Sequence, residues 1–106
     1  ILPAPDLASR TAAFAAADTA FHTCLAESTG NSLLIWIVGQ INSVRQQQQW
    51  SFMRQITLTE GMITHYNVQH RAILNAILER EPERAATLMK EHLETARLSL
   101  MRAAAA

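Results

Sequence analysis

Ala17-Asp18-Thr19-Ala20-Phe21-His22 lies near the middle of the first long helical pattern in the sequence. Asp18 and His22 are four residues apart, so on a helix their side chains lie one above the other on one face. That face also carries the apolar side chains of Phe14, Phe21 and Leu25, which predicts that the carboxylate and the imidazole point inward. A buried ionised carboxylate is costly unless it is paired or bound to a metal. The stretch therefore predicts a helix whose inner face needs a polar or metallic partner.

The rest of the chain has the periodicity of further helices. Four are predicted: from the Asp6 cap to about Ser28, from the Asn31 cap into the mid-50s, over the stripe 63–77, and from Pro82 onward. Gly30 is a natural left-handed terminator for the first of them, and 1–5 should be an irregular lead-in. Short connections favour antiparallel neighbours. The predicted fold class is an all-α antiparallel helical bundle with no strands.

Composition excludes several classes of protein. Of the 106 residues 49% are apolar and three are Gly, which is typical of an all-helical globular unit. The formal net charge is zero, so the chain lacks the overall positive charge that is typical of proteins that bind nucleic acid or an anionic membrane. The single cysteine allows no internal disulfide, and no apolar run approaches the roughly 18 residues that span a bilayer. We therefore expect a cytoplasmic protein without a membrane partner, and a chain starting at Ile1 is expected to be a piece of a longer protein.

One segment of the second predicted helix, Leu33 to Val38, is apolar all the way round. A helix without a polar face is either central in the fold or covers a partner subunit. The sequence leaves both interpretations open.

Two further histidines lie on apolar stripes. His70 and His92 each fall on the inner stripe of their own predicted helix, as Asp18 and His22 do on theirs. One aspartate and three histidines form a suitable ligand set for Zn²⁺ or another divalent first-row metal. His65 is excluded, because a separation of five residues rotates it about 140° from His70. The alternative is that these are hydrogen-bonded core histidines beside a local Asp–His ion pair.

With these residues placed, the chain resembles the FCD domain, the C-terminal effector-sensing domain of GntR-family transcription regulators of the FadR subfamily. The matching pattern runs over about residues 14–100: Asp18-x-x-Phe21-His22, Gly30-Asn31-x-x-Leu34, His70-Arg71-Ala72-Ile73-Leu74-Asn75-Ala76-Ile77, Glu83-x-Ala85 and Met89-x-x-His92-Leu93. Two positions depart from the usual pattern. Gln69 stands where Glu is common, and Arg80-Glu81-Pro82 replaces the usual Gly-Asp before the last helix.

The resemblance implies a function and a set of partners. Asp18, His22, His70 and His92 would hold a divalent metal, with Zn²⁺ as the first choice and Ni²⁺, Mn²⁺ or Fe²⁺ as alternatives. The metal would lie at the base of a cavity that binds a small organic acid. The acid would act on a homodimer whose N-terminal winged-helix domains bind operator DNA. Residues 1–106 would then be a partial ligand-sensing and dimerisation domain. By this resemblance, the first helices of the family domain and the winged helix-turn-helix domain would be absent from this chain.

Effector contacts are predicted at a few polar positions. Arg45 is the best anchor, since it follows Ile41 and Val44, which are expected to point inward, and guanidinium binds carboxylates bidentately. Three further candidates are Asn42, Asn67 and Arg71.

Two other functions compete with a regulator. A metal-dependent hydrolase would need a general base, for which His65 is the sole candidate. A structural, metal-stabilised dimerisation bundle would need no effector. The expectation is a domain that is not an enzyme.

Overall fold

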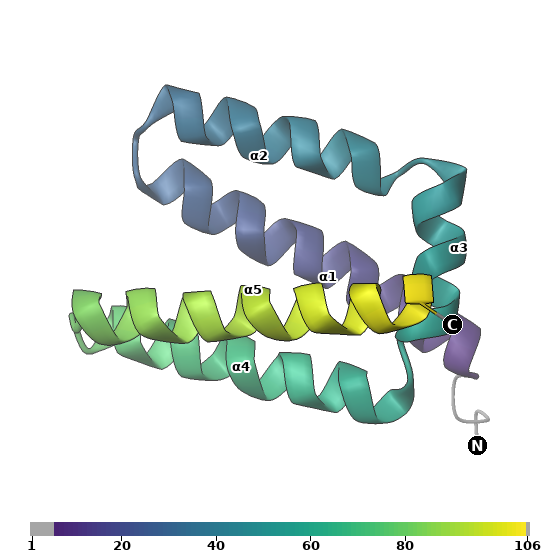
Figure 1. Cartoon of the computed structure of the whole chain (residues 1–106). Coiled ribbons are helices and arrows are strands. Elements are labelled where there is room, and N and C mark those ends of the chain that lie inside the picture. Colours follow the sequence, from purple (N-terminus) through teal and green to yellow (C-terminus); the bar gives the residue numbers. More distant parts are fainter. Residues whose placement is uncertain (1–5, 106) are drawn as a thin grey trace, which may run out of the picture. The chain divides into compact units, whose positions relative to one another are not determined.

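The computed structural model describes residues 6–105 and contains five helices: α1 (Leu7–Ser28), α2 (Ser32–Arg45), α3 (Gln48–Thr57), α4 (Glu60–Leu78) and α5 (Pro82–Ala105) (Figure 1). No strand occurs among these described residues, so the predicted all-α class is confirmed. The lead-in predicted at 1–5 lies outside them. The chain divides into two compact units, residues 1–55 and 56–106, which are considered in turn.

In the first unit α1 and α2 form an antiparallel hairpin whose ends are capped as predicted (Figure 1). The backbone N–H of Ser9 donates to Asp6 Oδ1 at 2.8 Å, and this bond holds the pKa of Asp6 below its usual value. Asn31 Oδ1 accepts from the N–H groups of Leu33 and Leu34 at 3.1 and 3.2 Å. Gly30 has a φ of 67°, the left-handed conformation expected of it.

The second predicted helix is wrong in length, because it is broken at Gln46 and Gln47 into α2 and α3. Arg45 and Arg54, on either side of the break, both contact Asp18. In one continuous helix they would point to opposite sides, about 180° and some 13.5 Å apart. The break therefore allows two cations from successive helices to reach the same buried carboxylate.

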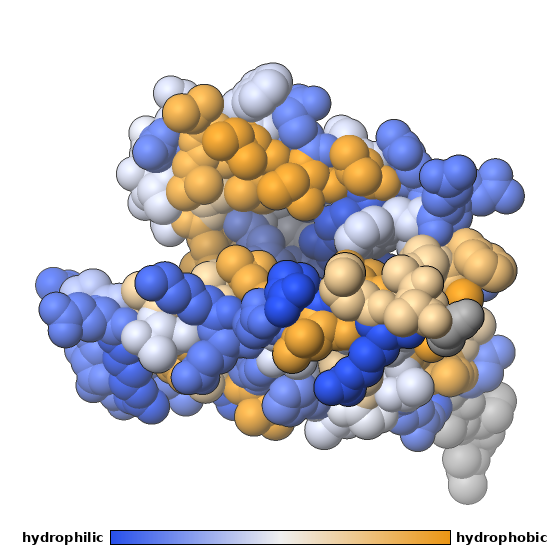
Figure 2. All heavy atoms as spheres, in the orientation of Figure 1, coloured by the Kyte–Doolittle hydropathy of each residue, from blue (hydrophilic) through white to orange (hydrophobic). Residues whose placement is uncertain are grey.

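The expectation that α2 could be central in the fold is also wrong. None of its residues is buried, and the side chains of Leu33 and Trp36 are 66% and 62% exposed. Apolar side chains gather over this helix on the molecular surface (Figure 2). The stripe of α2 that is partly buried is narrow and consists of Ile35, Val38, Asn42 and Arg45.

The second unit is the antiparallel hairpin of α4 and α5. Its buried residues are Leu58, Tyr66, Ile73, Ala76 and His92. The predicted start at Pro82 is confirmed. The N–H of Glu81 donates to the carbonyl of Ala76 at 2.9 Å and that of Arg80 to Ile77 at 3.0 Å, the two bonds of a Schellman motif. Arg80 has a φ of 58° in this turn.

Candidate metal and effector site

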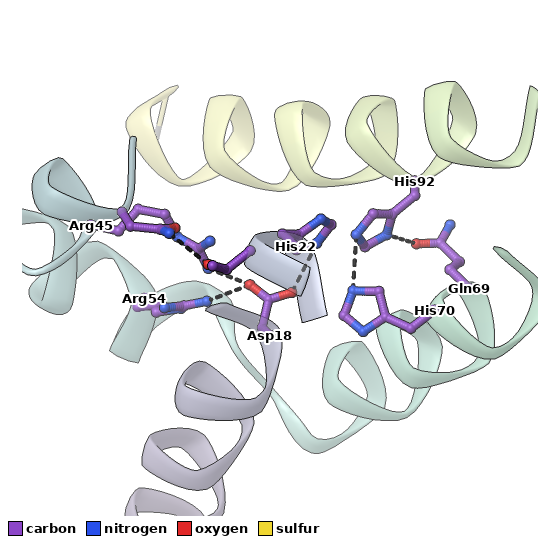
Figure 3. Close-up of polar contacts among 9 residues, drawn as sticks. Asp18, His22, Arg45, Arg54, Gln69, His70 and His92 are labelled. Atoms are coloured by element: carbon purple, nitrogen blue, oxygen red, sulfur yellow. Dashed lines mark hydrogen bonds and ion pairs between the residues drawn. The ribbon is translucent and has the colours of Figure 1, made fainter. Parts of the chain in front are cut away.

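The first unit holds one buried carboxylate beside one imidazole. His22 Nε2 lies 3.2 Å from Asp18 Oδ1, one turn apart on α1 (Figure 3). Asp18 is only 7% exposed, and the ring of Phe21 stands edge-on to that of His22 at a centroid distance of 5.4 Å. The helical spacing in the sequence thus correctly predicted that the two side chains share an inner face, and their contact is the local ion pair that the alternative interpretation expected.

Two guanidinium groups also contact Asp18 in this unit. Arg45 Nη2 donates to Asp18 Oδ2, and Arg54 Nη2 donates to the same oxygen at 3.1 Å (Figure 3). Both arginine side chains are only 15% exposed. Cationic donors stabilise a carboxylate that has been removed from water. Asp18 is therefore bound by cationic side chains from two other helices.

Arg45 reaches the interior for a reason other than the one expected. Ile41 and Val44 are each 51% exposed, so the inward direction assigned to them is wrong. Arg45 instead follows Asn42 on the narrow inner stripe, and Asn42 Nδ2 donates to Thr23 Oγ1 of α1 at 3.0 Å. Arg54 was not singled out in the sequence, because its position depends on the break between α2 and α3.

The second unit holds two imidazoles in contact. His70 Nε2 on α4 and His92 Nε2 on α5 are 3.1 Å apart, with ring centroids at 4.6 Å (Figure 3). His92 is 4% exposed, and the ring of Tyr66 packs edge-on against it at 5.6 Å. The two nitrogens that face each other are of the type that binds a divalent metal.

Gln69 determines which nitrogen of His92 carries a proton. Thr95 Oγ1 donates to the carbonyl of Glu91 at 2.9 Å and so accepts from Gln69 Nε2 at 3.0 Å. The amide oxygen Oε1 is then directed at His92 Nδ1, which donates to it at 2.7 Å. A neutral His92 protonated on Nδ1 has its lone pair on Nε2, where it faces His70. Gln69 was noted in the sequence only as a departure from the usual Glu.

The other predicted polar residues of this unit lie on exposed surface. Asn67 and Arg71 line a hollow of about 390 Å³ along one side of α4. Their role toward an effector stays a prediction. His65 is exposed, and its Nε2 lies 3.4 Å from Gln69 Nε2.

The donor groups suit a divalent first-row metal. One unit offers a carboxylate and an imidazole in contact, and the other offers two imidazoles, one with its lone pair fixed by a hydrogen bond to its second nitrogen. A histidine that binds a metal through one nitrogen commonly donates from the other to an oxygen acceptor, which fixes its tautomer. The Gln69–His92 contact has this arrangement.

Comparison with known proteins identifies the family. The sequence model of the FCD domain matches residues 3–95. The chain therefore belongs to the FCD domain family, and the resemblance seen in its sequence is confirmed. It is 28% identical over 76 residues to the HTH-type transcriptional repressor GlaR of Escherichia coli strain K12, covering 72% of this chain and 34% of the repressor. The chain thus spans about a third of the length of that curated relative. No solved structure matches.

Proposed function

We propose that this chain is the effector-sensing part of a GntR-type transcription regulator of the FadR subfamily. Its membership of the FCD family and its similarity to a protein named as an HTH-type transcriptional repressor support this proposal. DNA binding would belong to a winged-helix domain outside residues 1–106. A sensing domain changes DNA binding when its ligand favours one arrangement of the protein over another, so no enzymatic step is required.

The metal of this regulator would be held by Asp18, His22, His70 and His92. The orientation of His92 by Gln69 is the observation that supports this part most strongly, because it directs the Nε2 lone pair of His92 toward His70 Nε2. When bound, the metal would act as a Lewis acid toward a carboxylate. Zn²⁺ suits three imidazoles and one carboxylate, and Ni²⁺, Mn²⁺ and Fe²⁺ are alternatives.

The effector would be a small organic acid. Arg45 is the first candidate to hold its carboxylate, because its guanidinium already binds a carboxylate oxygen of Asp18. Asn42 lies one turn before Arg45 on the same inner stripe of α2. Asn67 and Arg71 remain candidates from the sequence.

The assembly would be a cytoplasmic homodimer that acts on operator DNA, without a membrane partner. None of the described helices is both long enough and apolar enough to cross a membrane. The cytoplasmic location follows from the proposed action on DNA. The exposed apolar side chains of α2 support its use as the contact with a second subunit.

Elemental analysis of the purified protein tests the metal proposal. We expect about one equivalent of a divalent metal per chain, since four protein ligands complete one shell. His70→Ala should remove it, whereas His65→Ala, which changes an exposed histidine of the same helix, should leave it in place. Absence of metal in the parent, with no gain in thermal stability on adding Zn²⁺ or Ni²⁺, would contradict the proposal.

A further inference from the structure

A cleft of about 680 Å³ lies within the first unit, between α1 and the two helices that follow it. Small side chains of α1, among them Ala12, Ala15 and Ala16, form one wall. The charged groups among its lining residues are Arg45 and Arg54. Because both are cations and the volume is that of a small-molecule site, the cleft is suited to a small organic anion.

The two arginines are close enough to hold one carboxylate together. Their Nη2 atoms both contact Oδ2 of Asp18. Both side chains line the cleft as well and remain mostly buried. The two guanidinium groups therefore form a carboxylate-binding site that the side chain of Asp18 occupies. The same two groups also line a cleft that is large enough for the carboxylate of a ligand.

We propose that a small organic acid binds in this cleft by carboxylate exchange: its carboxylate takes the place of Asp18 on Arg45 and Arg54. Arg54 is thus a second anchor that the sequence did not suggest. The exchange rests on the proposed function in one respect, because Asp18, once the acid has displaced it from the two arginines, is the residue proposed to bind the metal. No covalent bond changes, and one carboxylate replaces another on the same donors.

The exchange couples the metal to the acid. Asp18 cannot bind both guanidiniums and a metal as strongly as it binds either alone, and a divalent cation repels the guanidiniums beside it. A metal bound to Asp18 would therefore weaken the contacts between Asp18 and the two arginines that line the cleft. Because coupling between two binding sites is reciprocal, the acid tightens metal binding by the same factor as the metal tightens acid binding.

The remaining lining narrows the class of acid. Asn42, Gln46 and Ser51 border the cleft together with Thr19. Their amide and hydroxyl groups bind hydroxyl groups of a ligand, so a hydroxylated carboxylic acid fits better than a purely aliphatic one.

Calorimetric titration with glycolate, lactate, malate and gluconate tests the inference. Sorbitol, an uncharged analogue of gluconate, is the control. We expect at least one of these acids to bind, more tightly to Zn²⁺-loaded protein than to metal-free protein, and sorbitol not to bind. Arg54→Gln should weaken acid binding at least about tenfold, while Arg97→Gln, which breaks an exposed ion pair with Glu94 on α5, should change nothing.

Metal affinity separates this inference from the proposed function. Arg54→Gln should bind Zn²⁺ as tightly as the parent or more tightly, because one competitor for Asp18 is gone. An acid held by the metal alone would bind Arg54→Gln and the parent equally, which would overturn the exchange while the metal site stood. If none of the acids binds the metal-loaded parent, or if metal loading weakens their binding, the inference is wrong. This comparison of the parent in two states decides the question even if Arg54→Gln does not fold.

Discussion

Gln69 illustrates how one uncharged side chain can orient a histidine that is proposed to bind a metal. Its amide is oriented by Thr95 and in turn fixes the tautomer of His92. Removing such a hydrogen-bonding partner typically lowers metal affinity 10- to 100-fold. We expect Gln69→Ala to lower Zn²⁺ affinity by roughly that factor, measured by competition with a chromogenic chelator.

Two further variants make this test specific. Gln69→Glu should bind Zn²⁺ at least as tightly as the parent, because a carboxylate accepts the Nδ1–H more strongly than an amide does. Thr64→Ala, an exposed change on the same helix, should leave affinity unchanged. Equal affinity in Gln69→Ala and the parent would show that His92 does not bind the metal through Nε2.

At the scale of residues, helical spacing was enough to predict that Asp18 and His22 share the inner face of one helix. The role of Gln69 was not predictable, since it depends on Thr95, 26 positions further along the chain. Arg45 was identified by an argument that the exposure of Ile41 and Val44 contradicts. Contacts within one helix can be read from spacing, whereas contacts between helices depend on how the helices pack.

At the scale of elements, the turn between α4 and α5 contains a strained position. Arg80 adopts a φ of 58°, where a side chain with a Cβ is disfavoured and Gly is not. Arg80→Gly should raise the free energy of unfolding by about 0.5–1 kcal/mol, measured by urea denaturation. Glycine has its own cost in the unfolded chain, which limits the gain.

A second glycine substitution serves as the control. Lys90→Gly lies at an exposed position inside α5 and should lower stability by about 1 kcal/mol. Loss of stability in Arg80→Gly of the same size as in Lys90→Gly would mean that the left-handed turn is not strained.

Helix ends were predictable where a residue type has one clear role. Asp6, Asn31, Gly30 and Pro82 all mark ends as expected. The break at Gln46 and Gln47 was missed, because glutamine is a good helix former and no Gly or Pro marks the site. The break brings Arg45 and Arg54 to Asp18, and such a contact between helices is not visible in the spacing of residues along the chain.

At the scale of the whole molecule, the exposed side of α2 bears on assembly. Leu33, Trp36, Ile41 and Val44 are each at least half exposed on this one helix. If this surface forms the proposed dimer contact, Trp36→Glu should raise the dimer dissociation constant at least about tenfold, measured by analytical ultracentrifugation. Leu78→Glu, at a position that is 70% exposed on α4, should have no such effect. A parent that sediments as a monomer, or a Trp36→Glu variant that dimerises as well as the parent, would contradict this assignment.

The central proposal is that Asp18, His22, His70 and His92 bind one metal ion. It is tested most directly by titrating Zn²⁺ into the parent and into Asp18→Ala and His92→Ala, which remove one ligand from the first and the second unit respectively. The account predicts one tight site per chain in the parent and a loss of tight binding in both variants, because each removes a ligand of the same ion. Tight binding that survives Asp18→Ala but not His92→Ala, or the reverse, would show that the ion belongs to one unit alone and would contradict the account.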